Sequence, residues 1–366
     1  MEDTLGSSYL NFTVGPVMMD PQILSLGAEP LPYFRTPEFS DLMFRNEAML
    51  LQLLNADEGS RAVFITGSGT ASMEAAVASL YGKEDKVLVV NGGSFGARFA
   101  QLLSLHGIPN TQIVLEPGKT LTREMLDPYE GKGYTGFLLQ HDETSTGVLY
   151  DMNLVGDFCL RNKLFLTVDC ISSFLADAAD MKQWGAGAVI VGSQKAIALP
   201  PGISAIALNG EGVARAEAHD AGSLYLDVKV YLKNMERGQT PFTPAVGTLI
   251  QMNARMTALL KAGGAHAAVR EVRERALYFR KSIEQLPFDI FPETPANGVT
   301  ALAVRNGADA KAIFMTMKDK HHIFVCPNGG DLEHKVFRVG HIGVISTDQV
   351  DRLVAALSLT LEELAK

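Results

Sequence analysis

The chain has 366 residues, of which 47% are hydrophobic and 20% charged, and its formal net charge of −9 argues against a nucleic-acid-binding protein, which would need a basic face. The three cysteines, Cys159, Cys170 and Cys326, form no CxxC pair, so the sequence signals neither a zinc ribbon nor a disulfide framework, and reduced thiols fit a cytoplasmic protein. The first ten residues show no basic start before an apolar run, and no apolar stretch reaches the ~18 residues of a membrane span, so we expect neither a signal peptide nor a transmembrane helix.

Short apolar runs alternate with helical patterns over most of the chain. Strands spaced by helices in this way predict an α/β fold with a mostly parallel, seven-stranded sheet sandwiched by helices. Because ligands of such sheets bind at the carboxyl ends of strands, functional residues are expected in the loops that follow the strands. The predicted strands are 62–66, 86–90, 112–114, 136–140, 164–168, 188–192 and 204–208, with helices at about 71–81 and 95–105.

The pattern changes after about Pro244. A long helical stretch is predicted from about 247 to 286, in which Glu271 and Arg275 have the i, i+4 spacing of a solvated helix face. Shorter strands near 301–304 and 337–340 and a terminal helix near 347–364 complete the prediction. We therefore expect an N-terminal segment (1–20) that is associated with the functional site and the small domain, a large domain (21–246), and a small C-terminal α+β domain (247–366).

A glycine-containing turn, Thr66-Gly67-Ser68-Gly69-Thr70, lies between the first of these strands and a helix. Glycines let backbone N–H groups approach an anion closely, a helix N-terminus adds positive potential, and Ser68 and Thr70 can donate hydroxyl hydrogen bonds. The turn has no Walker lysine, and Ser72 stands where the third glycine of GxGxxG would be, so a nucleotide is disfavoured. A single phosphate fits better; the structural alternative is a capped tight turn.

Polar residues also follow two later strands. The segment His141-Asp142-Glu143-Thr144-Ser145-Thr146-Gly147 contains a His-x-Glu pair without a third ligand at helical spacing, so we expect no metal site, and a solvated loop is the alternative. Asp169 ends the apolar run that begins at 164. A buried carboxylate there needs a charged partner, such as a protonated pyridine nitrogen, unless it caps the next helix.

Lys195 follows the strand 188–192, which is apolar along its length. Burial near the sheet edge would lower the pKa of this amine far enough for Schiff-base formation, although most lysines after strands are simply exposed. An anion loop, an acidic strand end and a lysine thus lie in chain order on one sheet. A ring cofactor with a phosphate at one end, a basic nitrogen at the other and an aldehyde between them would use all three, and pyridoxal 5′-phosphate (PLP) is that molecule.

The sequence resembles the class V, fold type I, PLP-dependent aminotransferases, close to the alanine–glyoxylate and serine–pyruvate group. The resemblance covers nearly the whole chain, from 12–16 to 337–341, and its most specific piece is Gly-Ser-Gln-Lys195 with Pro-Pro-Gly downstream. The His-x-Glu-Thr-Ser-Thr-Gly segment and the segment 89–96 reinforce it. It implies a PLP-binding large domain, a homodimer with shared active sites, and amino-group transfer from a small amino acid (alanine, serine or similar) to glyoxylate or pyruvate through a Lys195 Schiff base.

The resemblance also implies a role for individual residues. Lys195 would hold the cofactor and shuttle a proton, and Asp169 would pair with the ring nitrogen. Arg338 matches the arginine that binds the substrate carboxylate, and Gly15 and Pro16 match an N-terminal loop that closes near the substrate. The further cofactor contacts that it implies are Ser68, Gly69, Thr70 and Gln194 at the phosphate, Phe95 stacked on the ring, Thr146 at the 3-oxygen side of the ring, and Thr243 at the phosphate of the neighbouring subunit.

Other interpretations of the sequence remain open. Arg35 lies in a segment (34–39) that resembles only part of the family, and it would either face a second anionic group or form an ordinary surface ion pair, which we favour. A 2-aminoethylphosphonate–pyruvate transaminase is an alternative, with Arg338 and Arg35 serving a phosphonate. A PLP lyase or desulfurase would need a reactive cysteine, but Cys326 and Cys170 are expected to be buried. A non-catalytic binding protein is disfavoured because Lys195 and Asp169 are both present.

Overall fold

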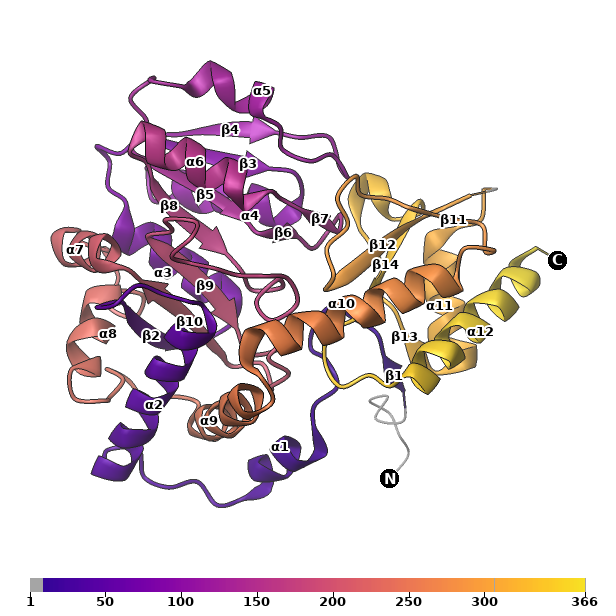
Figure 1. Cartoon of the computed structure of the whole chain (residues 1–366), viewed down its shortest axis with the longest axis horizontal. Coiled ribbons are helices and arrows are strands. Elements are labelled where there is room, and N and C mark those ends of the chain that lie inside the picture. The colour runs from indigo at the N-terminus through magenta and orange to yellow at the C-terminus, as the bar shows by residue number, and fades with distance from the viewer. Residues whose placement is uncertain (1–8, 306, 366) are drawn as a thin grey trace.

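The computed structural model describes residues 9–305 and 307–365, so residues 1–8 of the predicted N-terminal segment lie outside the described residues. A seven-stranded sheet of order β2-β10-β9-β8-β5-β3-β4 forms the centre of the larger part (Figure 1). Neighbouring strands are parallel except β10, which is antiparallel to both β2 and β9. All seven predicted strands are confirmed; they are β2 (Arg61–Thr66), β3 (Val87–Asn91), β4 (Asn110–Val114), β5 (Gly136–Gln140), β8 (Phe165–Asp169), β9 (Ala188–Gly192) and β10 (Ile203–Leu208).

Helices cover the sheet because its central strands are apolar throughout. Every residue of β5, β8, β9 and β10 is buried, as expected for strands that lie between two helical layers. The predicted helices at 71–81 and 95–105 correspond to α3 (Gly69–Leu80) and α4 (Ser94–Leu105), which pack against each other. The other helices of this part are α1 (Pro21–Ser25), α2 (Pro37–Leu53), α5 (Arg123–Leu126), α6 (Met152–Asn162), α7 (Gly210–Ala218) and α8 (Val228–Met235), with the 3-10 turns η1 (Leu26–Ala28) and η2 (Asp127–Tyr129).

A smaller antiparallel sheet has its own hydrophobic core. Its strands are β11 (Phe288–Ile290), β12 (Val299–Val304) and β14 (Val336–Gly340), and it packs with α11 (Ala310–His321) and α12 (Thr347–Leu364). The N-terminal strand β1 (Leu10–Asn11) pairs with β13 (Ile323–Phe324), and Phe12 belongs to this second core. The first described residues are therefore packed with this second core. The turn η3 (Gly330–Leu332) lies before β14.

The predicted helical stretch 247–286 is two helices, α9 (Val246–Lys261) and α10 (Gly264–Ser282) (Figure 1). They are separated where Gly263 and Gly264 take positive φ values of 107° and 69°, which end the right-handed turn. Helix α9 packs on α2 and contributes to the larger core. In α10, Val272 belongs to the larger core and Phe279 to the smaller one, so the change of core lies within α10 rather than at residue 247.

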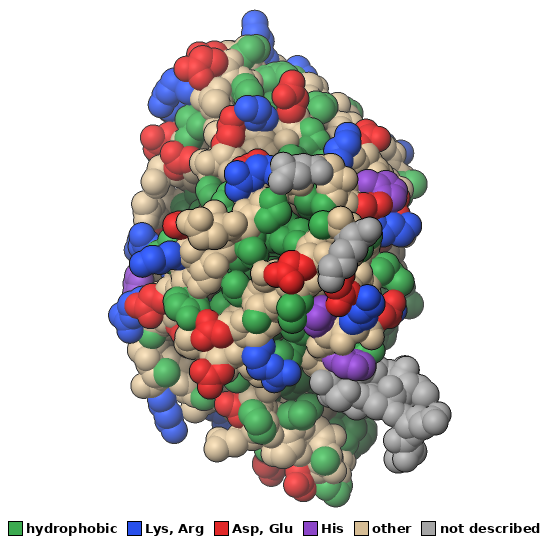
Figure 2. Space-filling view, turned by 90° about the vertical axis from the view of Figure 1, so that its right-hand side faces the viewer, with side chains coloured by type: hydrophobic (Ala, Val, Ile, Leu, Met, Phe, Trp, Pro, Cys, Tyr) green, Lys and Arg blue, Asp and Glu red, His purple; other side chains and the backbone are tan. Residues whose placement is uncertain are grey.

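Two surface features bear on the sequence predictions. The predicted Glu271–Arg275 pair is present at 2.6 Å, but Arg275 also donates to the carbonyl of His341 at 2.5 Å, so this side of α10 packs on the chain after β14. Seen from the side of the small domain, acidic and basic side chains are interspersed rather than separated (Figure 2). Within residues 9–305 and 307–365, none of the helices combines the length and the apolar character needed to cross a membrane.

Candidate active site

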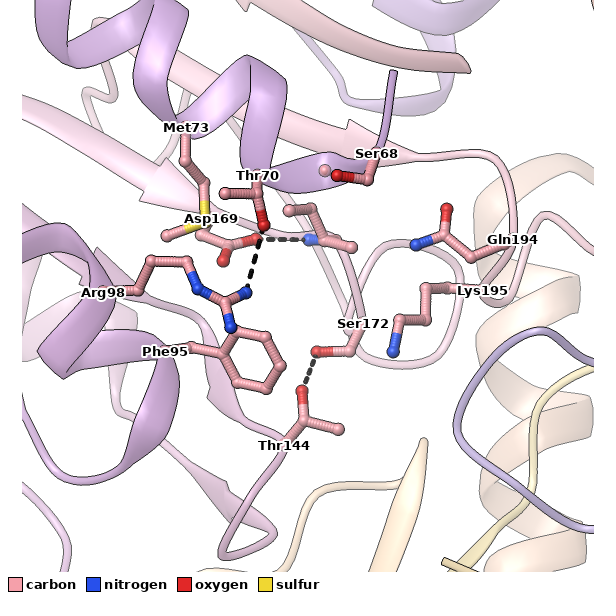
Figure 3. Close-up of a pocket in the computed structure, with 12 residues that line it drawn as sticks. Ser68, Thr70, Met73, Phe95, Arg98, Thr144, Asp169, Ser172, Gln194 and Lys195 are labelled. Carbon is pink, nitrogen blue, oxygen red and sulfur yellow. Dashed lines mark hydrogen bonds between the residues drawn. The ribbon is translucent and has the colours of Figure 1, made fainter. Parts of the chain in front are cut away.

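A cavity of about 210 Å³ lies where the chain leaves β2, β8 and β9 at their ends in the large sheet. These ends lie at one edge of the sheet because the three strands run in the same direction: β8 and β9 pair in parallel, and β10 is antiparallel to both β9 and β2. Side chains from the start of α3 and α4 and from the loops after β5, β8 and β9 point into it (Figure 3). The lining residues are Ser68, Gly69, Thr70, Met73, Phe95, Arg98, Thr144, Asp169, Ile171, Ser172, Gln194 and Lys195.

Lys195 enters this cavity from a tightly bonded loop between β9 and β10. Ser193 Oγ donates to the carbonyl of Pro200 at 2.6 Å, and the N–H of Leu199 donates to the carbonyl of Ser193 at 2.9 Å, which closes the loop on itself. Lys195 is 9% exposed, and burial lowers its pKa below that of an ordinary lysine. A larger fraction of the amine is therefore unprotonated near neutral pH and able to act as a nucleophile.

Asp169 is the last residue of β8 and lies in the same cavity (Figure 3). Its Oδ1 accepts a hydrogen bond of 2.8 Å from the N–H of Ile171, and within the described part of the chain it forms no ion pair. Burial raises the pKa of Asp169 to about 7. A buried carboxyl group with a pKa near 7 is well suited to pair with a basic ring nitrogen, because either group can hold the shared proton.

The N-terminus of α3 forms the anion-binding end of the cavity. Ser68 is the N-cap residue, but its side chain makes no capping hydrogen bond, so its hydroxyl is available to a ligand. Gly69 is packed so tightly that a Cβ atom there would come within 2.4 Å of Ile171 Cδ1. Gln194 lines the same cavity, and its buried Oε1 atom has no hydrogen-bond partner among the described residues. The backbone N–H groups and hydroxyls of this turn can hold a phosphate.

Two residues near the start of α4, Phe95 and Arg98, form the opposite wall. The Arg98 guanidinium lies 4.8 Å from the centre of the Phe95 ring and donates to Thr70 Oγ1 at 3.1 Å. Phe95 had been expected here, whereas Arg98 had not. Its i, i+3 spacing from Phe95 at a helix start was the available signal, since such residues share one helix face.

The His-x-Glu pair has separate structural roles. The Glu143 carboxylate accepts the N–H groups of Phe95 at 3.1 Å and Gly96 at 3.0 Å, so it caps α4 and fixes the Phe95 wall. His141 instead packs against Trp184 with ring centres 4.8 Å apart, and burial lowers its pKa to about 3. The two side chains therefore serve different parts of the fold. They belong to the chain around the short hairpin of β6 (Asp142–Glu143) and β7 (Val148–Leu149).

In this hairpin, Thr144 rather than Thr146 faces the cavity. Thr146 is 1% exposed, and its hydroxyl donates to the carbonyl of Glu143 at 3.3 Å. Thr144 lines the cavity, and its hydroxyl lies 2.6 Å from Ser172 Oγ. Of the two threonines, Thr144 is therefore the one whose hydroxyl borders the cavity.

Arg338 and the N-terminal loop lie at the edge of the cavity. Arg338 Nη1 donates to the carbonyl of Thr144 at 3.0 Å, Nη2 donates to that of Pro327 at 2.6 Å, and the buried Nε has no partner among the described residues. The positive charge of Arg338 contributes to the lowered pKa of Lys195. A Cβ atom on Gly15 would come within 2.7 Å of Lys195 Cδ, which places this loop directly over the lysine; the carbonyl of Pro16 accepts from Asn11 Nδ2 at 2.9 Å.

Two expected contacts lie away from the cavity of the same chain. Thr243 lines a separate open depression together with Leu31 and Pro200. Arg35 Nη1 donates to the carbonyl of Thr240 at 2.7 Å, and Nη2 donates to that of Pro241 at 3.1 Å. Arg35 therefore fixes the segment that contains Thr243, which differs from the surface ion pair expected from the sequence.

Together, the sheet, the small domain and this cavity define a PLP-dependent enzyme of fold type I. Residues 35–330 match the model of the family "Aminotransferase class-V", and the chain belongs to this family. It is 29% identical over 359 residues to an uncharacterised aminotransferase of Methanocaldococcus jannaschii, with 96% of this chain and 92% of that protein covered.

Two further comparisons agree with this assignment. The chain is 26% identical over 363 residues to an alanine–glyoxylate aminotransferase of Rattus norvegicus, with 96% of this chain and 87% of that protein covered. The solved structure of an alanine–glyoxylate aminotransferase from Nostoc sp. matches with a TM-score of 0.91 and 24% identity over 96% of this chain and 95% of that chain, which supports the fold. The protein is thus a PLP-dependent transaminase.

The cavity fits this cofactor on chemical grounds. It combines a buried lysine with a lowered pKa, Lys195, and a buried carboxyl group, Asp169, that forms no ion pair with the described residues. It also contains a helix N-terminus at which the Ser68 hydroxyl makes no capping hydrogen bond. These three groups correspond to the aldehyde, the ring nitrogen and the phosphate of PLP.

Proposed function

We propose that this transaminase moves an amino group from a small amino acid, such as alanine or serine, to a small 2-oxo acid, such as glyoxylate or pyruvate. The observation that carries the proposal is the Arg338 guanidinium at the edge of the cavity, whereas the other guanidinium of the site, that of Arg98, lies at the phosphate end beside Thr70. One guanidinium fork matches one carboxylate, so a short substrate with a single carboxylate is favoured.

The residues of the chain would divide the work as follows. Bound PLP supplies an electron sink for breaking the Cα–H bond of the substrate. The Nζ of Lys195 holds the cofactor, and when released it accepts the proton from Cα and returns it. Asp169 keeps the ring nitrogen protonated, and Ser68, Gly69, Thr70 and Gln194 hold the phosphate. Arg338 orients the substrate carboxylate, and the loop of Gly15 and Pro16 covers Lys195 and excludes water.

The other enzyme classes have less support in the structure. A 2-aminoethylphosphonate substrate would call on Arg35, which lies away from the cavity and donates to the backbone of Thr240 and Pro241. A desulfurase would need an accessible thiol. Cys170 is fully buried with a raised pKa, and Cys326 is 9% exposed and accepts a hydrogen bond from the N–H of Val14 at 3.3 Å.

We also propose that the enzyme is a cytoplasmic homodimer with shared active sites. Support comes from the depression that Thr243 lines, which is bordered by Leu24 and Leu31, exposed to 57% and 62%. Apolar side chains with this exposure favour burial against another chain. In the dimer, Thr243 would reach the phosphate in the neighbouring subunit. The oligomeric state in solution, compared between the wild type and Leu31→Glu, tests this part of the proposal.

The experiment that tests the function is a pair of half-reactions followed by absorbance. The PLP-loaded protein is mixed with alanine, serine, aspartate or 2-aminoethylphosphonate. The protein that then carries the amino form of the cofactor is mixed with glyoxylate or pyruvate. We expect alanine or serine to convert the cofactor fastest. The variant Lys195→Ala should retain the fold and lose turnover by orders of magnitude. Near-normal turnover in this variant, or preference for the phosphonate, would contradict the proposal.

A further inference from the structure

A second buried carboxyl group lies next to the cavity and has no place in the roles described above. Asp142, in β6, is 1% exposed, and its Oδ1 accepts a hydrogen bond from Ser172 Oγ. The Ser172 hydroxyl is in turn 2.6 Å from the Thr144 hydroxyl, and both line the cavity (Figure 3). A chain of three side chains therefore runs from a buried carboxyl group to the cavity wall. Asp142 Oδ2 has no hydrogen-bond partner among the described residues.

The direction of this chain depends on one proton, because each hydroxyl has a single hydrogen to donate. When Asp142 is ionised, Ser172 donates to the carboxylate and must accept the hydrogen of Thr144, which then presents only lone pairs to the cavity. When Asp142 is protonated, its O–H can donate to Ser172, and Ser172 can donate to Thr144. The hydrogen of Thr144 is then free to point into the cavity. The Thr144 hydroxyl in the cavity wall thereby changes from a hydrogen-bond acceptor to a hydrogen-bond donor.

The Thr144 end of this hydrogen-bonded chain of side chains lies where a substrate carboxylate is expected. The carbonyl of Thr144 accepts a hydrogen bond of 3.0 Å from Arg338 Nη1, so the Thr144 hydroxyl and the guanidinium belong to the same end of the cavity. A carboxylate bound by Arg338 gains a hydrogen bond if Thr144 donates and meets oxygen lone pairs if it accepts. Only the first arrangement adds to carboxylate binding.

The surroundings of Asp142 favour its protonated form near neutral pH. The pKa of Asp142 is raised to about 8, mainly by burial and in addition by Asp177 and Asp169, while the Ser172 hydrogen bond and Lys195 act in the opposite direction. The ionisable side chains that interact with it are Asp169 and Cys170 at the end of β8, Asp177 in the following loop, Lys195 after β9 and Tyr150 after β7.

We propose that Asp142 is a positioning residue that sets, through Ser172, the direction of the Thr144 hydroxyl and thereby the strength of carboxylate binding. The inference rests on the proposed function, because Arg338 defines the carboxylate end. Carboxylates bind more tightly below the pKa of Asp142 than above it.

The first test measures the affinity of the PLP-loaded protein for propionate across a pH series, by calorimetry. Propionate has the carboxylate but neither the amino nor the oxo group, so no turnover occurs. In the wild type we expect the affinity to fall about tenfold as the pH rises through the pKa of Asp142. Asp142→Asn, whose amide can donate to Ser172 but does not ionise, should bind tightly without this fall.

Two variants distinguish the effect of the hydrogen-bonded side chains Asp142, Ser172 and Thr144 from general effects at the site. Ser172→Ala removes the middle hydroxyl and should bind propionate weakly at low pH, without the wild-type fall. Ser173→Ala is the matched control, because the Ser173 hydroxyl is buried next to Ser172 in the chain but does not line the cavity. It should keep the wild-type profile. An identical pH profile in wild type and Asp142→Asn would overturn the proposal, as would the absence of propionate binding.

The second test does not depend on cofactor or substrate. Infrared spectra of the cofactor-free wild type, minus those of Asp142→Asn, should contain a protonated carboxyl band that disappears as the pH rises through about 8. If this band is absent at every pH, Asp142 is always ionised and the proposal fails. Failure of the proposed function has a different signature: the half-reactions would favour 2-aminoethylphosphonate over alanine and serine, whereas the carboxyl band of the cofactor-free protein would be unchanged.

Discussion

Arg98 Nη1 donates a hydrogen bond of 3.1 Å to Thr70 Oγ1 and so joins the start of α4 to the start of α3. The same guanidinium covers the Phe95 ring and lowers the pKa of Asp169. One side chain thus contacts the phosphate end of the cavity, the aromatic wall and, through its charge, the carboxyl group at the nitrogen end.

Replacement of Arg98 by methionine should weaken PLP binding about tenfold, because a charge-assisted hydrogen bond and the cation–π contact are lost. The affinity can be measured by absorbance titration of the cofactor-free protein. Arg161→Met is a suitable control, since Arg161 forms only a surface pair with Glu130 at 3.5 Å. Unchanged affinity in Arg98→Met would show that Arg98 only packs against its neighbours.

Loading of the cofactor should take up a proton at a pH that depends on Asp169. Burial raises the pKa of Asp169 to about 7, so below this pH the carboxyl group already carries the proton that the ring nitrogen needs. Above it, the carboxylate is ionised and the proton comes from solvent. The difference in proton uptake between wild type and Asp169→Asn should rise to about one proton as the pH increases through 7. Calorimetry in buffers of different ionisation enthalpy measures this difference, and a pH-independent difference would refute the assignment.

Replacement of Arg338 by lysine should raise the KM for both amino and oxo acids by roughly 10- to 100-fold, because the two-pronged contact to a carboxylate is lost. The effect on kcat should be smaller, since Arg338 does not contact the reacting atoms in the proposed arrangement. Steady-state kinetics with alanine and glyoxylate provide the measurement. A variant with normal KM and reduced kcat would place the carboxylate elsewhere.

A methyl group at Gly15 should interfere with cofactor binding. A Cβ atom there would lie 2.7 Å from Lys195 Cδ and 3.0 Å from the carbonyl oxygen of Gln194, and the φ of +127° also disfavours alanine. Gly131→Ala is the matched control, with a φ of +65° and nothing within 4 Å of the added carbon. Both variants should lose about 1–2 kcal/mol of folding stability. Only Gly15→Ala should also lose PLP affinity, measured by absorbance; equal affinity in the two variants would contradict this.

The raised pKa of Asp142 should also make the stability of the protein depend on pH. The raised pKa of Asp142 stabilises the folded state below its ordinary pKa, and this contribution is lost as the pH rises through about 8. The stability of the wild type relative to Asp142→Asn should therefore fall as the pH increases between about 4 and 8, by up to about 1.4 kcal/mol per pH unit. Urea unfolding of the cofactor-free proteins at several pH values measures this trend, and the opposite slope would show that Asp142 is ionised in the fold.

The large sheet, the cofactor and three residues of the site can be predicted from the amino-acid pattern alone. Apolar runs predict strands locally, and strands that run in the same direction end at one edge of the sheet, which brings Ser68, Asp169 and Lys195 together. Tertiary contacts decided the rest. Two threonines in one short turn point in different directions, so only the folded hairpin selects Thr144 over Thr146.

Long-range packing also decided features that no local pattern contains. Arg98 reaches Thr70, Arg35 fixes the backbone near Thr240, and Ser172 joins Asp142 to the cavity wall. Each contact links segments far apart in the chain, and the partner of a polar side chain depends on which segments the core brings side by side. The break between α9 and α10 is different, because the Gly263-Gly264 pair is a local helix-ending signal, and the positive φ of both residues marks where α9 ends.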